Sequence, residues 1–99
     1  MMVEVIRKDY EAESWTDRRG RSHYHPAHHY CRYLYDGKEI ANYDSISDVI
    51  YLKTDYIGHD FSKTVYDRAV NSKYKEAYRY LFDMLGVDKT SRLSEYSNL

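Results

Sequence analysis

The residues best suited to chemistry lie between Arg18 and Tyr35, in a segment without any acidic side chain. Arginines neutralise phosphate groups and aromatic rings stack on unpaired bases, so this mixture suits single-stranded nucleic acid. It suits docking on an acidic protein surface equally well. The segment holds four arginines, four histidines and four tyrosines: Arg18, Arg19, Arg21, Arg32, His23, His25, His28, His29, Tyr24, Tyr30, Tyr33 and Tyr35.

Six of these residues form the candidate binding surface, because arginine and tyrosine present broad, rigid faces with hydrogen-bond donors at their ends. The alternative is a solvated loop and an ordinary strand, with acidic residues packed around them in space. The net charge of −1 at pH 7 weakens the case for nucleic acid. The six selected residues are Arg18, Arg19, Arg21, Tyr24, Tyr30 and Arg32.

The histidines, together with Cys31, are residue types that bind zinc. Their spacing, H-x-H-x-x-H-H-x-C, matches no closed structural zinc site. His28 and His29 also point to opposite faces if they lie on a strand. We therefore predict surface histidines, with neither a metal site nor a cofactor.

A second enzymatic interpretation starts from His23-Tyr24-His25, which resembles the His–hydrophobe–His metal motif of rolling-circle replication endonucleases. Tyr74 and Tyr78 lie four residues apart, as paired nucleophilic tyrosines do in that superfamily. A phenol would then attack a phosphodiester activated by a divalent metal. However, Tyr24 is a poor hydrophobe, Pro26 disturbs the required strand, and Tyr74 lies in an apolar stripe. We therefore predict core tyrosines and no enzyme.

The single cysteine, Cys31, is a further candidate nucleophile beside the histidines. The sequence indicates no orienting partner for it, so a buried structural cysteine is the favoured interpretation. The chain contains no glycine-rich phosphate loop, no G-x-S-x-G and no paired-carboxylate motif.

Strands and turns must position the candidate surface. The pattern predicts strands over Met2–Tyr10, His28–Tyr35 and Lys38–Tyr43, and a loop tip at Arg18–Arg21. Asp36-Gly37 is a type I′ hairpin signal. A two-residue loop there places Tyr33 opposite Ile40 and Cys31 opposite Asn42.

Two helices are predicted after the hairpin. The first covers Ile46–Ile57, with a short buried strand at Val49–Leu52 as the alternative. The second begins at a cap, Asp60 or Ser62, and ends at Gly86. Its apolar stripe should cover one face of the sheet: Tyr66, Val70, Tyr74, Ala77, Leu81, Met84 and Leu85.

The rest of the chain, 87–99, is a polar tail in which Ser91–Tyr96 is a candidate helical turn. These elements predict a single α+β domain over 1–99. A small antiparallel sheet packs against a long C-terminal helix.

Composition bounds the possible functions. The 99 residues are 42% hydrophobic and 31% charged, which excludes collagen, a long disordered tail and a membrane span. One cysteine excludes an intrachain disulfide. Thirteen tyrosines, three asparagines and no glutamine favour a thermophilic source, because side-chain amides are lost in hot environments.

The tyrosine richness, the missing glutamine and two segments, HHYCRYLYDGKEIANY and YKEAYRYLFDMLGV, resemble a family of small proteins from filamentous and rod-shaped viruses of hyperthermophilic, acidophilic archaea. The resemblance covers the whole chain and implies an unusual α+β fold without enzymatic activity. Related proteins of rod-shaped viruses inhibit type III CRISPR effector complexes.

We therefore expect a viral accessory protein that acts by binding in the host cytoplasm. The expected partner is a host protein or ribonucleoprotein, specifically a type III CRISPR effector complex, and no membrane. The alternative is a nucleic-acid-binding protein of viral replication or transcription, with the nickase as its enzymatic form. The sequence does not set the oligomeric state.

Overall fold

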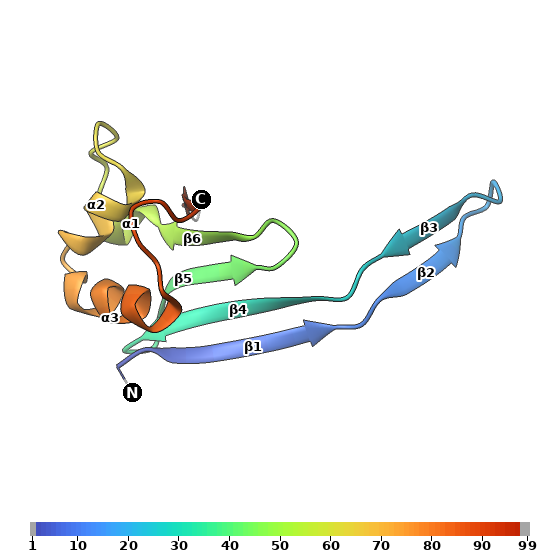
Figure 1. Ribbon diagram of the computed structural model, residues 1–99, viewed down its shortest axis with the longest axis horizontal. Coiled ribbons are helices and arrows are strands. Elements are labelled where there is room, and N and C mark those ends of the chain that lie inside the picture. Colours follow the sequence, from blue (N-terminus) through green and yellow to red (C-terminus); the bar gives the residue numbers. More distant parts are fainter. Residues whose placement is uncertain (1, 98–99) are drawn as a thin grey trace.

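The computed structural model describes residues 2–97 and shows a molecule built mainly from strands (Figure 1). Over this range it contains seven strands and three short helices. In chain order they are β1 (Glu4–Tyr10), β2 (Glu13–Thr16), β3 (Ser22–His25), β4 (His28–Tyr35), β5 (Lys38–Asp44), β6 (Val49–Lys53), α1 (Thr54–Ile57), α2 (Val65–Val70), α3 (Lys75–Leu85) and β7 (Leu93–Tyr96).

Five strands form the main sheet in the order β1-β4-β5-β6-β7, and β2 and β3 form a separate two-stranded sheet. The first three pairings of the main sheet are antiparallel, but β6 and β7 are parallel. The sheet is therefore mixed, and the predicted small antiparallel sheet is wrong. A parallel neighbour requires a long connection, which α1, α2 and α3 supply here.

The predicted long C-terminal helix is also wrong. The chain breaks after α2, and the longest helix, α3, has 11 residues. Near the break, the Asn71 amide donates to the Asp67 carbonyl and the Ser72 hydroxyl donates to the Ala69 carbonyl. Such side-chain bonds compete with helix continuation. The predicted end at Gly86 is confirmed, with a left-handed φ of 69°.

The region predicted as a helix over Ile46–Ile57 is instead a turn, the strand β6 and the four-residue α1. The alternative of a strand at Val49–Leu52 is confirmed. Leu52 is fully buried opposite Ala41 of β5. Its burial in the sheet outweighs the helical spacing of the apolar residues Ile46, Val49, Ile50 and Ile57.

The hairpin between β4 and β5 is confirmed. Asp36 and Gly37 have φ values of 50° and 74°, and both are positive, as a type I′ turn requires. The predicted register fails beyond the turn, because Leu34 pairs with Glu39 but Tyr33 pairs with Ala41. The irregularity leaves Ile40 as an extra residue, a β-bulge. Ile40 and Ala41 are consequently both fully buried.

The helices lie at one end of the main sheet, where they bury its core (Figure 1). Tyr78 of α3 is fully buried, and its hydroxyl donates to the Ile40 carbonyl over 2.8 Å. Burial raises the pKa of Tyr78 far above its usual value. Cys31 is buried in the same core, as predicted. The α3 residues that are buried are Ala77, Tyr78, Leu81 and Phe82.

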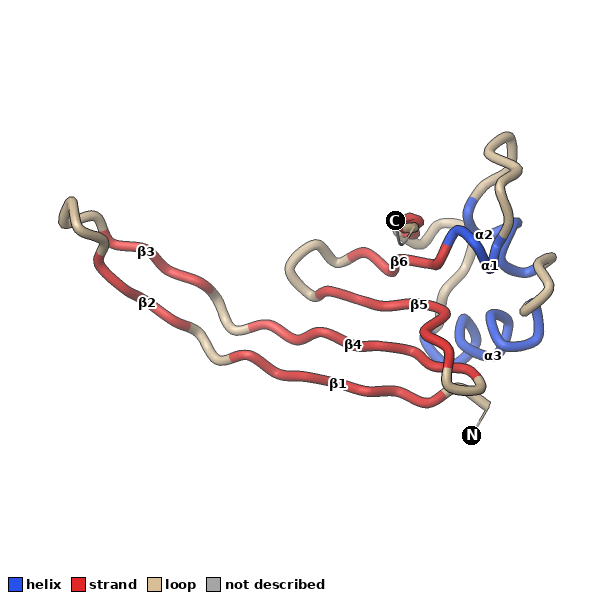
Figure 2. Tube along the Cα trace, turned by 180° about the vertical axis from the view of Figure 1, so that it is seen from behind, coloured by secondary structure: helices blue, strands red, loops and turns tan. Residues whose placement is uncertain are grey.

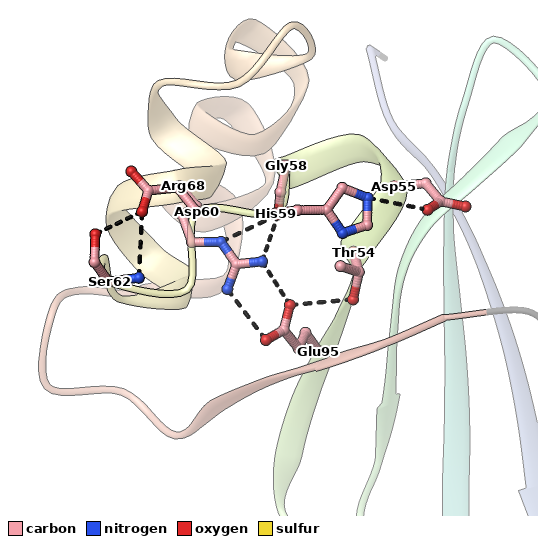
Figure 3. A network of polar contacts seen from close by, with 8 residues as sticks. All are labelled: Thr54, Asp55, Gly58, His59, Asp60, Ser62, Arg68 and Glu95. Atoms are coloured by element: carbon pink, nitrogen blue, oxygen red, sulfur yellow. Dashed lines mark hydrogen bonds and ion pairs between the residues drawn. The ribbon is translucent and has the colours of Figure 1, made fainter.

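A buried arginine ties β7 to the helices (Figure 3). The Arg68 side chain is 3% exposed, and its two terminal nitrogens donate to the Glu95 carboxylate over 3.1 and 2.7 Å. Arg68 Nε also donates to the Gly58 carbonyl, and the Thr54 hydroxyl donates to Glu95. Arg68 and, to a lesser degree, Thr54 hold the pKa of Glu95 below its usual value.

This arrangement corrects the prediction for the C-terminal segment. The proposed helical turn at Ser91–Tyr96 is wrong, because Leu93–Tyr96 is the edge strand β7. The polar residue Glu95 faces inward to meet Arg68, so polarity here does not mark a solvated tail. The last two residues of that tail lie outside the described residues.

Candidate binding arm

The strands β2 and β3 and their turn, Glu13–His25, form an arm that extends from the end of the main sheet opposite the helices (Figures 1 and 2). All eight residues of the two strands are exposed. Pro26 lies between β3 and β4, and since it has no backbone N–H it interrupts the ladder there. The arm contributes to a long, narrow molecule of 52 × 32 × 28 Å.

The turn at the tip is organised by Asp17. One carboxylate oxygen accepts the backbone N–H groups of Arg19 and Arg21, each over 2.9 Å. The other lies 2.9 Å from His23 Nε2 and 3.5 Å from Arg21 Nε. The contact with His23 and the backbone bonds lower the pKa of Asp17. The turn is thus fixed by its own residues, which confirms the predicted loop tip at Arg18–Arg21.

Positive charge is concentrated at this tip. Within residues 2–97, ion pairs are found for Arg21 but not for Arg18 or Arg19. The flank of the arm is different, because β2 and the residues before it supply Glu11 and Glu13. The acid-free segment seen in the sequence therefore has acidic neighbours in space, and only the tip keeps an excess of positive charge.

Aromatic and imidazole rings line one face of the arm and its base. Trp15 stacks on His23 at 5.4 Å, and Tyr10 stacks on His28 at 4.7 Å with nearly parallel planes. His25 meets His28 edge-on at 4.7 Å. A shallow hollow of about 300 Å³ lies between these groups, lined by Tyr10, Glu11, Glu13, Trp15, His25 and His28.

The six residues selected from the sequence fall into two groups. Arg18, Arg19, Arg21 and Tyr24 lie on the arm, and Tyr24 is 70% exposed. The other two, Tyr30 and Arg32, lie on β4 in the main sheet.

Those two sheet residues are engaged within the protein. Arg32 Nε donates to Glu39 over 2.6 Å, so its charge is compensated. Tyr30 is half-buried, and burial raises its pKa. The structure therefore does not bring Tyr30 and Arg32 together with the arginines of the tip.

Sequence reasoning missed Trp15 and Tyr10, because the acid-free segment begins after them. A usable signal existed in the two alternating stretches that flank the turn, ESWT and SHYH. Paired as a hairpin, they place Trp15 opposite His23. Because the basic turn was considered without β2, Trp15 was left out of the candidate surface.

The two parts of the nickase motif lie apart. His23 and His25 belong to β3, whereas Tyr78 and Tyr74 belong to α3 and its N-cap, at the opposite end of the molecule (Figure 1). The hydroxyl of Tyr78 is buried and hydrogen-bonded. Among residues 2–97, no three His, Cys, Asp or Glu side chains cluster as metal ligands.

Comparisons with protein-family models, curated proteins and solved structures give no significant match to this chain. None of the helices over the described range has the length and apolar character needed to span a membrane. The resemblance to the archaeal viral family stays a prediction.

Proposed function

We propose that this protein acts by binding and that the arm is the part that contacts the partner. The observation that carries the proposal is a projecting hairpin whose strand residues are all exposed. The arm presents tryptophan, tyrosine and arginine, the residue types that dominate binding energy at protein interfaces. Its exposure indicates that these side chains contribute little to the core.

For the partner, we propose a host ribonucleoprotein defence complex, a type III CRISPR effector, in the cytoplasm of an archaeal cell. The resemblance to the viral family supports this choice. The chemistry of the tip fits it as well, because guanidinium groups bind carboxylates and phosphates in bidentate fashion. Both groups are abundant on a complex of protein and RNA.

Capture from host extract tests the proposal. The wild-type protein, Arg18→Glu/Arg19→Glu and the control Lys75→Glu are each used as bait. We expect the double variant to bind at least ~10-fold more weakly, because two favourable charge contacts become repulsive. Lys75 is exposed on α3, so its reversal should leave capture unchanged.

The melting temperatures of all three proteins should agree, since the tip is exposed. Wild-type affinity of the double variant across a salt titration would remove the tip from the binding site. Capture of Cas subunits supports the proposed partner. Binding of bare nucleic acid without capture of Cas subunits supports the second candidate function, a single-stranded nucleic-acid binder.

The second candidate is a single-stranded nucleic-acid binder, favoured by the exposed Trp15 and His23 rings on the arm and by the Tyr10–His28 stack at its base. Trp15 is the single tryptophan of the chain and is 50% exposed, so its fluorescence reports contacts of the arm directly. A titration with oligonucleotides would quench this fluorescence if bases stack there. With manganese or magnesium present, we expect neither strand cleavage nor a covalent adduct.

A further inference from the structure

The outer edge of β1 is open. Within residues 2–97, β1 pairs with β4 on one side and with no strand on the other (Figures 1 and 2). All seven of its residues are exposed. Three of them are apolar or aromatic, since Val5 and Ile6 are 40% and 41% exposed and Tyr10 at the end of the strand is 40% exposed. An exposed, partly apolar edge is a template for another strand.

We propose that β1 pairs with β1 of a second copy of this chain, antiparallel, around a twofold axis at Ile6. The main sheets of two protomers then form one continuous sheet. In a twofold antiparallel pair, one residue must lie opposite its own copy, and its neighbours pair symmetrically around it. The charges along β1 decide which residue this is.

Most positions for the twofold axis along β1 are unfavourable. An axis at Glu4, Arg7, Lys8 or Asp9 places two like charges directly opposite each other, which destabilises a strand pair. An axis at Tyr10 places Asp9 opposite Glu11 of the partner subunit, which again opposes two acidic residues. An axis at Val5 brings Glu4 opposite Ile6 and pairs no charges. This leaves Ile6 for further consideration.

With the axis at Ile6, Ile6 packs on its own copy and Glu4 lies opposite Lys8 of the partner subunit. The symmetry makes this oppositely charged pair occur twice. On the other face, Val5 lies opposite Arg7 of the partner subunit. The charge of Arg7 is already compensated by Asp9 of its own strand at 2.9 Å, so its aliphatic stem is available for packing.

The shape of the protomer permits the pairing. In both views the arm bends toward the side of β5 and β6, away from the outer edge of β1 (Figures 1 and 2). The arm of the first copy therefore points away from a second copy on this edge. The self-complementary order Glu4, Ile6, Lys8 selects a second copy over an unrelated strand. This inference is independent of the partner of the arm.

Charge reversal with rescue tests the register. The mass of the full chain is measured by light scattering after gel filtration and by sedimentation equilibrium over a concentration series. We expect a dimer for the wild type and at least ~10-fold weaker dimerisation for Glu4→Lys and for Lys8→Glu. The double variant Glu4→Lys/Lys8→Glu restores both oppositely charged pairs and should regain the dimer.

Glu76→Lys, an identical change at an exposed position of α3, serves as the control and should remain dimeric. Circular dichroism verifies that each variant is folded. A monomeric wild type up to ~1 mM would overturn the proposal. So would a dimer that both single variants retain, or one that the double variant fails to regain.

Discussion

Asp17 in the arm and Glu95 in the main body each accept three hydrogen bonds, and both have a lowered pKa. The donors to Asp17 lie two to six residues away in the chain. The donors to Glu95 lie 27 and 41 residues away, and Arg68 is buried. The first carboxylate shapes a local turn, whereas the second connects distant parts of the fold. Hydrogen bonds of the same kind and number should therefore contribute very differently to the free energy of unfolding of the whole protein.

The largest effect is expected for Arg68→Ala. The change leaves the Glu95 carboxylate and the Gly58 carbonyl without their guanidinium donor. Breaking a buried ion pair in this way costs about 3 kcal/mol or more of the free energy of unfolding. Urea denaturation measures it. Lys63→Ala removes an exposed ion pair with Asp60 and should cost less than ~1 kcal/mol; equal losses would contradict the comparison.

Glu95→Gln gives a smaller loss that depends on pH. The folded protein lowers the pKa of Glu95 from its usual value of 4.5, which we take for the unfolded chain. Ionisation of this carboxylate therefore stabilises the fold at pH values above 4.5. The stabilisation disappears as the pH falls through the lower, folded pKa. The difference in unfolding free energy between wild type and Glu95→Gln should therefore shrink from pH 7 to pH 3. A constant difference would show that shape rather than charge is responsible.

Tyr78→Phe should cost about 1–2 kcal/mol, because it leaves the buried Ile40 carbonyl without a donor. Chemical denaturation at neutral pH measures the loss. Tyr80→Phe on the same helix is the control, since Tyr80 is only partly buried and no hydroxyl bond is found for it in the described part of the chain. A similar loss in both variants would assign the effect to the ring environment.

Gly37 and Gly20 allow the same change in both regions. Their φ values are 74° and 78°, so a valine is strained at either position by about 1–2 kcal/mol. Gly37→Val should lower global stability by this amount, because its hairpin lies inside the main sheet. Gly20→Val should lower it by less than ~0.5 kcal/mol, since the arm strands are fully exposed and we expect the arm to open without the main sheet. Hydrogen exchange distinguishes local from global opening. Equal losses of global stability in the two variants would show that the arm and the main sheet unfold as one cooperative unit.

Local signals made particular strands and turns of this fold predictable. β1, the β4–β5 hairpin, its turn and the tip of the arm follow from alternation and turn residues. The break before α3 was masked because Tyr66, Val70 and Tyr74 continue the helical stripe across it. The polar residues Asn71 and Ser72, which end α2, were the available signal.

Non-local partners were beyond the sequence pattern. The inward orientation of Glu95 depends on Arg68, and the parallel pairing of β7 depends on three helices placed between it and β6. In the candidate site, Gly20 and the neighbouring arginines were enough to predict an exposed basic loop tip. Its aromatic face did not, because Trp15 and His23 meet only when the hairpin closes.

The Arg68–Glu95 pair also makes the docking of α2 and the pairing of β7 a single cooperative event. Arg68 lies 27 residues before Glu95 in the chain. A buried guanidinium that lacks its anion is strongly destabilising. We therefore expect α2 to pack stably on the sheet only when β7 supplies Glu95, so that hydrogen exchange finds both elements opening together.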